Sequence, residues 1–306
     1  MRILFTGASS FTGMWFVKHL AAAGHDVVMT FRGQPGDYDG LRRKRVELAA
    51  ACGEPVYGCS FGDECFIKLA HEGGFDVLGH HAADVSNYKS ADFDVSAALA
   101  NNTRNLRAIL AALKGSGCGR VVLTGSVFEP GEGAGSEGVR AFSPYGLSKG
   151  LTAQVVRFET EQAEMDFGKF VIPNPFGPYE EPRFTHYLVK RWREGKVPTV
   201  NTPAYVRDNI HVDLLARAYA SFVAASDHPQ FNPSGYVETQ GAFAQRFALE
   251  MDARLDLRCA VELAEQTQFD EPRIRINTDP VDGVALGFDE KQAWDEVAAF
   301  YEQAES

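Results

Sequence analysis

A tyrosine and a lysine four residues apart, Tyr145 and Lys149, lie in the segment SPYGLSKG. At the start of a helix this spacing places both side chains on one face. The lysine ammonium would then stabilise a tyrosinate and lower the pKa of the phenol, so that Tyr145 could exchange a proton with a hydroxyl or carbonyl near neutral pH. Ser126 precedes the pair in LTGSVFEPG, just past a predicted strand, where its hydroxyl could hydrogen-bond a substrate oxygen. The three residues together predict a proton relay.

A glycine-containing turn near the N-terminus predicts a phosphate-binding site. The segment ILFTGASSFTG reads as a strand, a turn and the start of a helix. Such a turn points backbone N–H groups and a helix N-terminus at a pyrophosphate, and its glycines permit close approach. The turn residues expected to bind a dinucleotide are Gly7, Ser9, Ser10, Phe11, Thr12 and Gly13. An ordinary tight turn between a strand and a helix is the alternative.

The end of the second predicted strand indicates which nicotinamide cofactor the turn would take. An acidic residue at that position accepts the ribose hydroxyls of NAD. This chain has VVMTFRGQ there, with Arg32 close to the strand end and no carboxylate. A cation favours the 2′-phosphate of NADP, so NADP(H) is the preferred cofactor and NAD(H) the alternative. The basic run RRKR at residues 42–45 follows, and a solvated helix face explains most of it.

The elements that must position these residues alternate through the first half of the chain. The apolar runs expected to form buried strands are residues 2–5, 27–31, 56–58, 75–79, 121–123 and 170–172. The amphipathic segments expected to form helices are residues 14–23, 66–70, 95–113 and 151–166. Such alternation predicts an α/β fold, a Rossmann-type doubly wound parallel sheet with helices on both faces. We expect a dinucleotide-binding domain over residues 1–174 and a smaller C-terminal substrate-binding lobe, partly interleaved with it, over residues 175–306.

The composition excludes several classes of protein. The chain has 306 residues, of which 45% are apolar and 23% charged, as in globular proteins. A formal charge of -11 argues against a nucleic-acid partner, which requires a phosphate-neutralising surface. The apolar runs are too short to span a membrane and MRILFTGASS is unlike a signal peptide, so we expect no membrane partner and a cytoplasmic location. The five cysteines lack paired metal-ligand spacing, and the adjacent His80 and His81 would point to opposite sides of a strand, so no metal is expected.

Several motifs resemble, in order and approximate spacing, those of the extended short-chain dehydrogenase/reductase family. They are TGASSFTG, DVLGHHAA, LTGS, YGLSK, IPNPFGP and RDNIHV, and they cover roughly residues 1–220. This family contains nucleotide-sugar epimerases, dehydratases and 4-keto-sugar reductases. The conjunction of motifs is far more specific than any one of them.

The resemblance implies a role for residues of each motif. Tyr145 would donate or accept the proton, Lys149 would lower its pKa and hold the cofactor ribose, and Ser126 would bind the reacting oxygen. The further residues expected at the cofactor are Ala82, Ala83 and Pro173, and those expected at the substrate are Asn174 and Arg207. His211 and Asp213 match family positions where packing is expected rather than catalysis.

Three features depart from the family pattern. The acidic residue that often follows the third strand, for the adenine, is not evident in YGCSFGD, where Asp63 is the candidate. Ser10 replaces a glycine of the phosphate turn. The helix asparagine of the family falls on Leu99, and Asn101 and Asn102 are the neighbouring candidates for its role. Asn102 is the one polar residue on the apolar stripe of the predicted helix 95–113, where it could be a core amide with a specific partner or the point at which the helix passes the active site.

The leading hypothesis for function is an NADP(H)-dependent enzyme that reduces the 4-keto group of a nucleotide-linked sugar. Its preference over a nucleotide-sugar 4-epimerase with tightly held NAD depends on Arg32, and a non-catalytic NADP-binding sensor is the hypothesis from another class. A dehydratase is disfavoured because no extra acid pair is recognised beside the serine motif. The basic stretch from Arg183 to Lys196 is either a solvated helix face or a funnel for the anionic substrate, and Arg183 is included among its candidate ligands. We also expect a homodimer whose contact is formed by residues 95–113 and 145–166.

Overall fold

The computed structural model describes residues 1–85, 87–88, 90–136, 139–225 and 228–303, and these divide into two compact units. Unit 1 comprises residues 1–132, 140–172 and 216–232. Unit 2 comprises residues 133–139, 173–215 and 233–306. Residues 216–232, expected in the C-terminal lobe, therefore group with unit 1. Each unit is described separately below.

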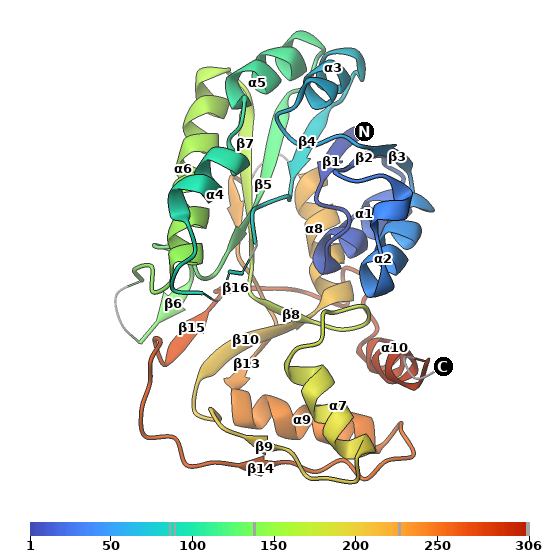
Figure 1. Cartoon of the computed structure of the whole chain (residues 1–306), viewed down its shortest axis with the longest axis vertical. Coiled ribbons are helices and arrows are strands. Elements are labelled where there is room, and N and C mark those ends of the chain that lie inside the picture. The colour runs from blue at the N-terminus through green and yellow to red at the C-terminus, as the bar shows by residue number, and fades with distance from the viewer. Residues whose placement is uncertain (86, 89, 137–138, 226–227, 304–306) are drawn as a thin grey trace. The chain divides into compact units, whose positions relative to one another are not determined.

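Unit 1 is built on a seven-stranded sheet in which every neighbouring pair is parallel. The strand order is β11-β7-β5-β4-β1-β2-β3 (Figure 1). The bounds are β1 Arg2–Thr6, β2 Asp26–Phe31, β3 Glu54–Tyr57, β4 Val77–His80, β5 Arg120–Ser126, β7 Asp166–Ile172 and β11 Gln230–Phe231. The sheet confirms the predicted α/β fold and adds β11, a two-residue strand that carries no periodic signal. Because all strands run the same way, the carboxyl ends of β1, β4 and β5 meet at one edge of the sheet.

Helices cover both faces of this sheet (Figure 1). One face carries α3 (Glu64–Glu72), α5 (Leu106–Gly115) and α6 (Pro144–Gln162), whose apolar side chains form a core with Leu4 and Val121 of the strands. The other face carries α1 (Phe11–Ala22) and α8 (Val212–Ala224), and there Phe16 stacks on Tyr219 with ring centroids 4.0 Å apart. The helix α2 (Gly40–Ala50) packs beside α1. Residues that alternate along a strand thus enter two different cores, which is the expectation for a doubly wound sheet.

The expected single helix over residues 95–113 is wrong, because the structure has two helices there. The first is α4 (Val95–Asn102) and the second is α5, and Asn105 between them has a φ of 52°. Asparagine tolerates this left-handed conformation better than most residues. Its side-chain amide donates to the carbonyl of Gly62 at 2.7 Å, and Thr103 Oγ1 donates to the carbonyl of Leu99 at 2.7 Å. These local bonds compete with the helical ladder and end α4.

The helix α6 begins earlier and ends earlier than the predicted segment 151–166. Ser143 is its N-cap, with Oγ accepting the N–H of Gly146 at 3.1 Å, and Pro144 occupies the first turn. Tyr145 and Lys149 therefore lie in the first two turns of α6, as predicted, while Asp166 already belongs to β7.

Unit 2 contains a five-stranded sheet in the order β13-β10-β15-β6, with β8 paired to β10. Its strands are β6 Ala134–Gly135, β8 Asn174–Phe176, β10 Val206–His211, β13 Tyr236–Thr239 and β15 Ile274–Ile276. Two short pairs accompany it, β9 (Thr199–Val200) with β14 (Glu262–Leu263) and β12 (Pro233–Ser234) with β16 (Asp279–Pro280). The helices α7 (Phe184–Arg193), α9 (Gln240–Asp252) and α10 (Glu290–Gln303) share an aromatic core that includes Trp192, Phe247 and Trp294.

Candidate active site

The phosphate turn between β1 and α1 depends on two glycines. Gly7 has a φ of 84°, and a Cβ added there would lie 2.8 Å from the backbone nitrogen of Ala82. A Cβ at Gly13 would lie 2.2 Å from the carbonyl oxygen of Gly7. Both positions therefore exclude any side chain, one by backbone conformation and both by close approach. The turn leaves the first-turn N–H groups of α1 at the sheet edge, where a pyrophosphate would bind.

Ser10, the departure from the usual glycine pattern, is the N-cap of α1. Its φ of -81° lies in the region open to all residues. Its Oγ accepts the N–H of Gly13 at 3.0 Å and donates to the carbonyl of Gly7 at 2.8 Å. The replacement of glycine thus stabilises the turn locally, because the serine closes it with two hydrogen bonds.

The end of β4 holds the turn from the other side. Thr6 Oγ1 accepts the N–H groups of His81 and Ala82 at 3.1 and 3.0 Å. The Nε2 of His81 lies 3.1 Å from both Ser10 Oγ and Thr12 Oγ1. Burial lowers the pKa of His81 to about 3, so the imidazole is neutral at physiological pH. Ala82 therefore lies against Gly7, and Ala83 follows it in the chain.

The end of β2 carries the residues expected to select the cofactor. Arg32 is exposed directly after the strand. Arg42 of α2 donates to Ser9 Oγ of the phosphate turn at 3.1 Å, so a second guanidinium reaches this side of the turn. The nearest carboxylate along the chain, Asp37, accepts the N–H of Gln34 at 2.7 Å within its own short helical turn.

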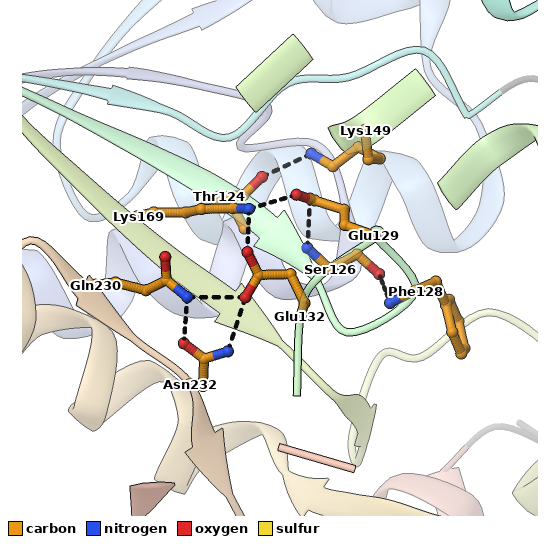
Figure 2. A network of polar contacts seen from close by, with 9 residues as sticks. All are labelled: Thr124, Ser126, Phe128, Glu129, Glu132, Lys149, Lys169, Gln230 and Asn232. Atoms are coloured by element: carbon orange, nitrogen blue, oxygen red, sulfur yellow. Dashed lines mark hydrogen bonds and ion pairs between the residues drawn. The ribbon is translucent and has the colours of Figure 1, made fainter. Parts of the chain in front are cut away.

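The serine, tyrosine and lysine come from β5 and α6. Lys149 is buried, and its Nζ donates to the carbonyl of Thr124 at 2.6 Å (Figure 2). Ser126 ends β5 two residues further on, and its Oγ accepts the N–H of Phe128 at 3.2 Å. Tyr145 is half-buried one turn before Lys149, with ring edges against Tyr88 at 5.4 Å between centroids. The fold thus joins the strand that ends in Ser126 to the helix that carries the Tyr–Lys pair.

Burial lowers the pKa of Lys149, and the nearby Glu129 carboxylate opposes that shift. Asn102 of α4 bonds both the segment that follows β4 and the helix α6. Its Oδ1 accepts the N–H of Asp84 at 2.8 Å, and its Nδ2 donates to Thr152 Oγ1 of α6 at 3.2 Å. Asn102 is buried whereas Asn101 is exposed, so Asn102 is the core amide with specific partners.

The remaining candidates lie in unit 2. Pro173 is buried, and Asn174 in β8 pairs in register with Asn209 of β10. Arg183 is exposed as the N-cap residue of α7. Arg207 is buried, and its guanidinium donates to the Glu271 carboxylate at 3.0 Å and to backbone carbonyls of residues 206, 272 and 273.

The structure also gives the contacts of His211 and of the basic stretch from Arg183 to Lys196. His211 is buried beside Phe176 and Phe288, and its Nδ1 accepts the N–H of Asp213 at 3.1 Å, which is a packing arrangement. In the basic stretch, Arg191 and Lys196 both pair with Glu194, at 2.8 and 3.0 Å. These pairs neutralise part of the charge on that segment.

A model of the NAD dependent epimerase/dehydratase family matches residues 3–233. The chain belongs to this family. Membership confirms the resemblance to extended short-chain dehydrogenases/reductases and the expectation of a nicotinamide-dependent enzyme. The motifs of the phosphate turn, the serine strand and the Tyr–Lys helix all fall within the matched residues.

Solved structures of epimerases and dehydratases share this fold. UDP-glucuronic acid 4-epimerase from Bacillus cereus, in complex with UDP-glucuronic acid and NAD, is 16% identical with a TM-score of 0.75, over 99% of this chain and 100% of that one. UDP-glucose 4-epimerase from Thermotoga maritima with UDP-glucose is 18% identical with a TM-score of 0.73, over 100% of both chains. The dTDP-glucose 4,6-dehydratase from Streptomyces venezuelae with NAD and TYD is 19% identical with a TM-score of 0.71, over 99% and 97%. No curated protein matches the sequence. At these identities the likeness establishes the fold.

The structure of this epimerase/dehydratase family member also contains acids beside the serine that the sequence analysis did not recognise. Glu129 and Glu132 follow Ser126 in SVFEPGE and are both buried. Their carboxylates pair with Lys169 of β7, each at 2.5 Å (Figure 2). The statement that no acid pair accompanies the serine motif is therefore wrong. The signal available was two glutamates in a segment that directly follows a buried strand.

Other features bear on metal binding and on membranes. The described residues include one cluster of potential metal ligands, formed by Cys59, Asp63 and Cys65. Asp63 caps α3 there, since its two carboxylate oxygens accept the N–H groups of Phe66 and Ser60, each at 2.8 Å. His80 and His81 contact different partners, as expected for neighbours at a strand end. Across the described ranges, no helix combines the length and the hydropathy needed to cross a bilayer.

Proposed function

We propose that this family member is an NADP(H)-dependent oxidoreductase that reduces the 4-keto group of a nucleotide-linked sugar. The observation that carries the proposal is the bond from Lys149 Nζ to the carbonyl of Thr124, at 2.6 Å. This bond joins the first turns of α6, which carry Tyr145, to the end of β5, which carries Ser126. The phenol of Tyr145, the ammonium of Lys149 and the hydroxyl of Ser126 are thereby held on two rigid elements, α6 and β5.

The chemistry that a bound nicotinamide supplies is hydride transfer. Tyr145 provides the proton: its O–H bond breaks as the keto oxygen takes up the proton, and a phenolate remains on the enzyme. The Lys149 ammonium stabilises that phenolate. Ser126 Oγ accepts the N–H of Phe128, which leaves the hydroxyl hydrogen to be donated to the reacting oxygen.

Several features support binding of the dinucleotide at the β1–α1 turn. A side chain is excluded at Gly7 and Gly13, so the backbone is open to close approach by a pyrophosphate. NADP(H) is favoured over NAD(H) because Arg32 is exposed at the end of β2 and Arg42 reaches Ser9. We propose that Asn174, Arg183 and Arg207 bind the substrate. We propose that Pro173 lies beside the nicotinamide of the cofactor.

A nucleotide-sugar 4-epimerase with tightly held NAD is the second candidate. It is favoured by the fold neighbours, two of which are 4-epimerases solved with UDP-sugars. An epimerase takes a hydride from the substrate and returns it within one cycle, so it consumes no reduced nicotinamide. Incubation with NADPH and a panel of 4-keto nucleotide sugars separates the candidates. Net oxidation of NADPH is expected. Interconversion of UDP-sugars without net oxidation would identify the epimerase. Tight NADPH binding with no reaction of either the 4-keto nucleotide sugars or the UDP-sugars would identify a sensor.

The decisive variant for the proton relay is Tyr145→Phe, which removes the proton and keeps the ring that packs on Tyr88. Turnover should fall by about two to four orders of magnitude, while affinity for NADPH changes little. Ser126→Ala should lower turnover less, because it deletes one hydrogen bond and no proton source. Near-normal turnover by Tyr145→Phe, measured as NADPH oxidation on the same sugar, would show that the proton comes from elsewhere.

The cofactor preference is tested by Arg32→Asp. NADPH should bind the unmodified protein at least about tenfold more tightly than NADH, a difference of about 1.4 kcal/mol. The variant should shrink or reverse that ratio, since a carboxylate repels the 2′-phosphate and accepts the ribose hydroxyl. Fluorescence titration of both cofactors measures the ratio, and equal affinities in the unmodified protein would refute the NADP preference.

We further propose a homodimer in which α4, α5 and α6 meet their counterparts. Each of these helices also packs inside its own unit, with α4 and α5 both beside α6. The outer face of α6 exposes Leu147 and Phe158, which supports a contact there. A dimer mass is expected by light scattering at micromolar concentration, and a monomer mass would contradict the contact.

A further inference from the structure

The serine loop, residues 126–132, contains two buried glutamates that pair with the buried Lys169 of β7. Lys169 Nζ contacts Glu129 Oε2 and Glu132 Oε1, each at 2.5 Å (Figure 2). The side chains of Lys169, Glu129 and Glu132 are 7%, 1% and 9% exposed. Charges so far from water persist only where they are paired and hydrogen-bonded. We call Glu129, Glu132 and Lys169 the ion cluster.

The second carboxylate oxygen of each glutamate also accepts hydrogen bonds. Glu129 Oε1 accepts the N–H of Ser126 at 2.8 Å. Glu132 Oε2 accepts from Gln230 Nε2 at 2.8 Å and from Asn232 Nδ2 at 2.9 Å. The cluster therefore reaches the backbone of the proposed catalytic serine directly, through one carboxylate.

The serine loop is pressed against the helix that carries Lys149. A Cβ at Gly146 would lie 2.2 Å from the carbonyl oxygen of Phe128, and a Cβ at Gly150 would lie 2.7 Å from Pro130 Cδ. These glycines stand on α6 on either side of Lys149. In β5, directly before the loop, a Cβ at Gly125 would lie 2.7 Å from Lys169 Cε and 3.1 Å from Glu129 Oε1. The loop therefore packs closely against α6 and is joined to β7 by the two ion pairs. A change in the ion cluster would be transmitted to both Ser126 and Lys149.

The charges around Lys149 come from several elements. Glu129 follows β5, Lys169 lies on β7, His80 ends β4 and His81 follows it. Burial lowers the pKa of His80 to about 4 and that of His81 to about 3, so both rings are neutral above pH 6. Burial is the largest cause that lowers the pKa of Lys149. Of the neighbouring charges, Glu129 raises that pKa and Lys169 lowers it.

We propose that Glu129 and Lys169 are positioning residues of the active site, which hold the serine loop against α6 and set the charge that faces Lys149. This inference rests on the proposed function, in which Lys149 binds the cofactor ribose and serves Tyr145. Lys169 pairs with both carboxylates, and the other oxygen of Glu129 accepts the Ser126 N–H, so one carboxylate joins β7 to the backbone of the serine.

The test compares Glu129→Gln with Lys169→Met. Glutamine keeps an acceptor for the Ser126 N–H and removes the charge, so Lys149 should lose its proton at lower pH. Methionine removes the opposing cation, so Lys149 should keep its proton to higher pH. The measurement is affinity for NADPH and NADH by nicotinamide fluorescence over about pH 6 to pH 10, where loss of the ammonium weakens binding. We expect the high-pH loss of affinity to move by about one pH unit, downward in Glu129→Gln and upward in Lys169→Met.

The matched control is Glu159→Gln, which removes a carboxylate from the solvent side of α6, where Glu159 pairs with Arg107 at 2.8 Å. It should leave the pH profile in place. Lys169→Arg, which keeps the charge, should return the profile toward that of the unmodified protein. If circular dichroism shows that Lys169→Met does not fold, the comparison of the pH profiles of Glu129→Gln and Glu159→Gln decides whether the proposal holds. If the ion cluster is purely structural, the variants should bind the dinucleotides more weakly but with an unchanged pH dependence. Unchanged pH dependence, or shifts of the same sign in Glu129→Gln and Lys169→Met, would overturn the proposal.

A Lys149→Met variant separates this inference from the proposed function. If Lys149→Met binds the cofactor like the unmodified protein, or if neither dinucleotide binds at all, the assignment of Lys149 is wrong and the positioning role falls with it. If Lys149→Met weakens binding while Glu129→Gln leaves the pH profile unmoved, only the role of the ion cluster is overturned.

Discussion

Two loops that leave the same sheet are held in contrasting ways. The phosphate turn after β1 is held mostly by neutral groups, the hydroxyls of Thr6, Ser10 and Thr12 and the uncharged His81, with one charged donor, Arg42, on Ser9. The serine loop after β5 is held by buried charges, through the ion cluster. Under the proposed function, a bound dinucleotide would bring its own negative charge to the first loop, whereas the second would serve a lysine that acts as an ammonium. The difference shows that one sheet edge can carry two electrostatic environments.

The partners of the two loops also differ in their distance along the chain. Ser10 bonds Gly7 and Gly13, three residues away on either side. Glu132 bonds Lys169, Gln230 and Asn232, which lie 37, 98 and 100 residues away. The cap of the phosphate turn therefore forms within the turn itself, although His81 also reaches Ser10 and Thr12 from 71 and 69 residues away. The side-chain partners of Glu132 all lie on β7 or at β11, so the serine loop depends on the completed sheet. The serine loop should therefore be the more sensitive of the two to substitution.

The largest expected effect is that of Lys169→Met on stability. It leaves two buried carboxylates without their cation, and the free energy of unfolding should fall by about 3–5 kcal/mol. Urea denaturation followed by circular dichroism measures it. The triple variant Lys169→Met, Glu129→Gln, Glu132→Gln should cost less than Lys169→Met alone, because no uncompensated charge remains. A triple variant less stable than the single would mean that the cluster is a net source of stability.

An intermediate effect is expected when the pH is lowered, because His81, which contacts the phosphate turn, is neutral when folded. The pKa of His81 is about 3 when folded and near 6.5 when unfolded, so below that upper value the unfolded chain binds more protons. The free energy of unfolding should therefore fall as the pH drops from about 6.5 to about 4, by on the order of 2 kcal/mol from this residue. The variant His81→Gln should show a shallower decline between the same pH values in urea denaturation. Identical slopes for the two proteins would show that His81 is protonated when folded.

The smallest expected effect is that of Ser10→Ala. It removes the N-cap of α1 and should lower the free energy of unfolding by about 1 kcal/mol. The matched variant Ser10→Gly, which restores the glycine usual in such turns, should cost only a few tenths of a kcal/mol. Thermal unfolding of the three proteins distinguishes them. Equal losses for alanine and glycine would mean that the contact with His81, rather than the cap, is what serine provides.

Much of the site could be predicted because its signals are local. Gly7, Gly13 and the spacing of Tyr145 and Lys149 each report a turn or a helix that neighbouring residues form by themselves. The break at Asn105 was missed because an apolar stripe continues across it, from Ala98 through Leu106 to Leu113, and periodicity alone cannot detect a residue that leaves the helical conformation. Two-residue strands such as β11 have no periodicity at all.

The sequence by itself determined the parallel sheet, the phosphate turn and the family, because these depend on short-range patterns of apolar residues, glycines and motif order. Only the tertiary structure decided what Glu129, Glu132 and Lys169 do. In the sequence they are ordinary charged residues in a loop and a strand, and their meaning comes from burial. Parallel pairing of β5 with β7 brings Lys169 beside the start of the serine loop, in register with Leu123. Once water is excluded there, the charges must satisfy one another, and that requirement is a property of the assembled fold.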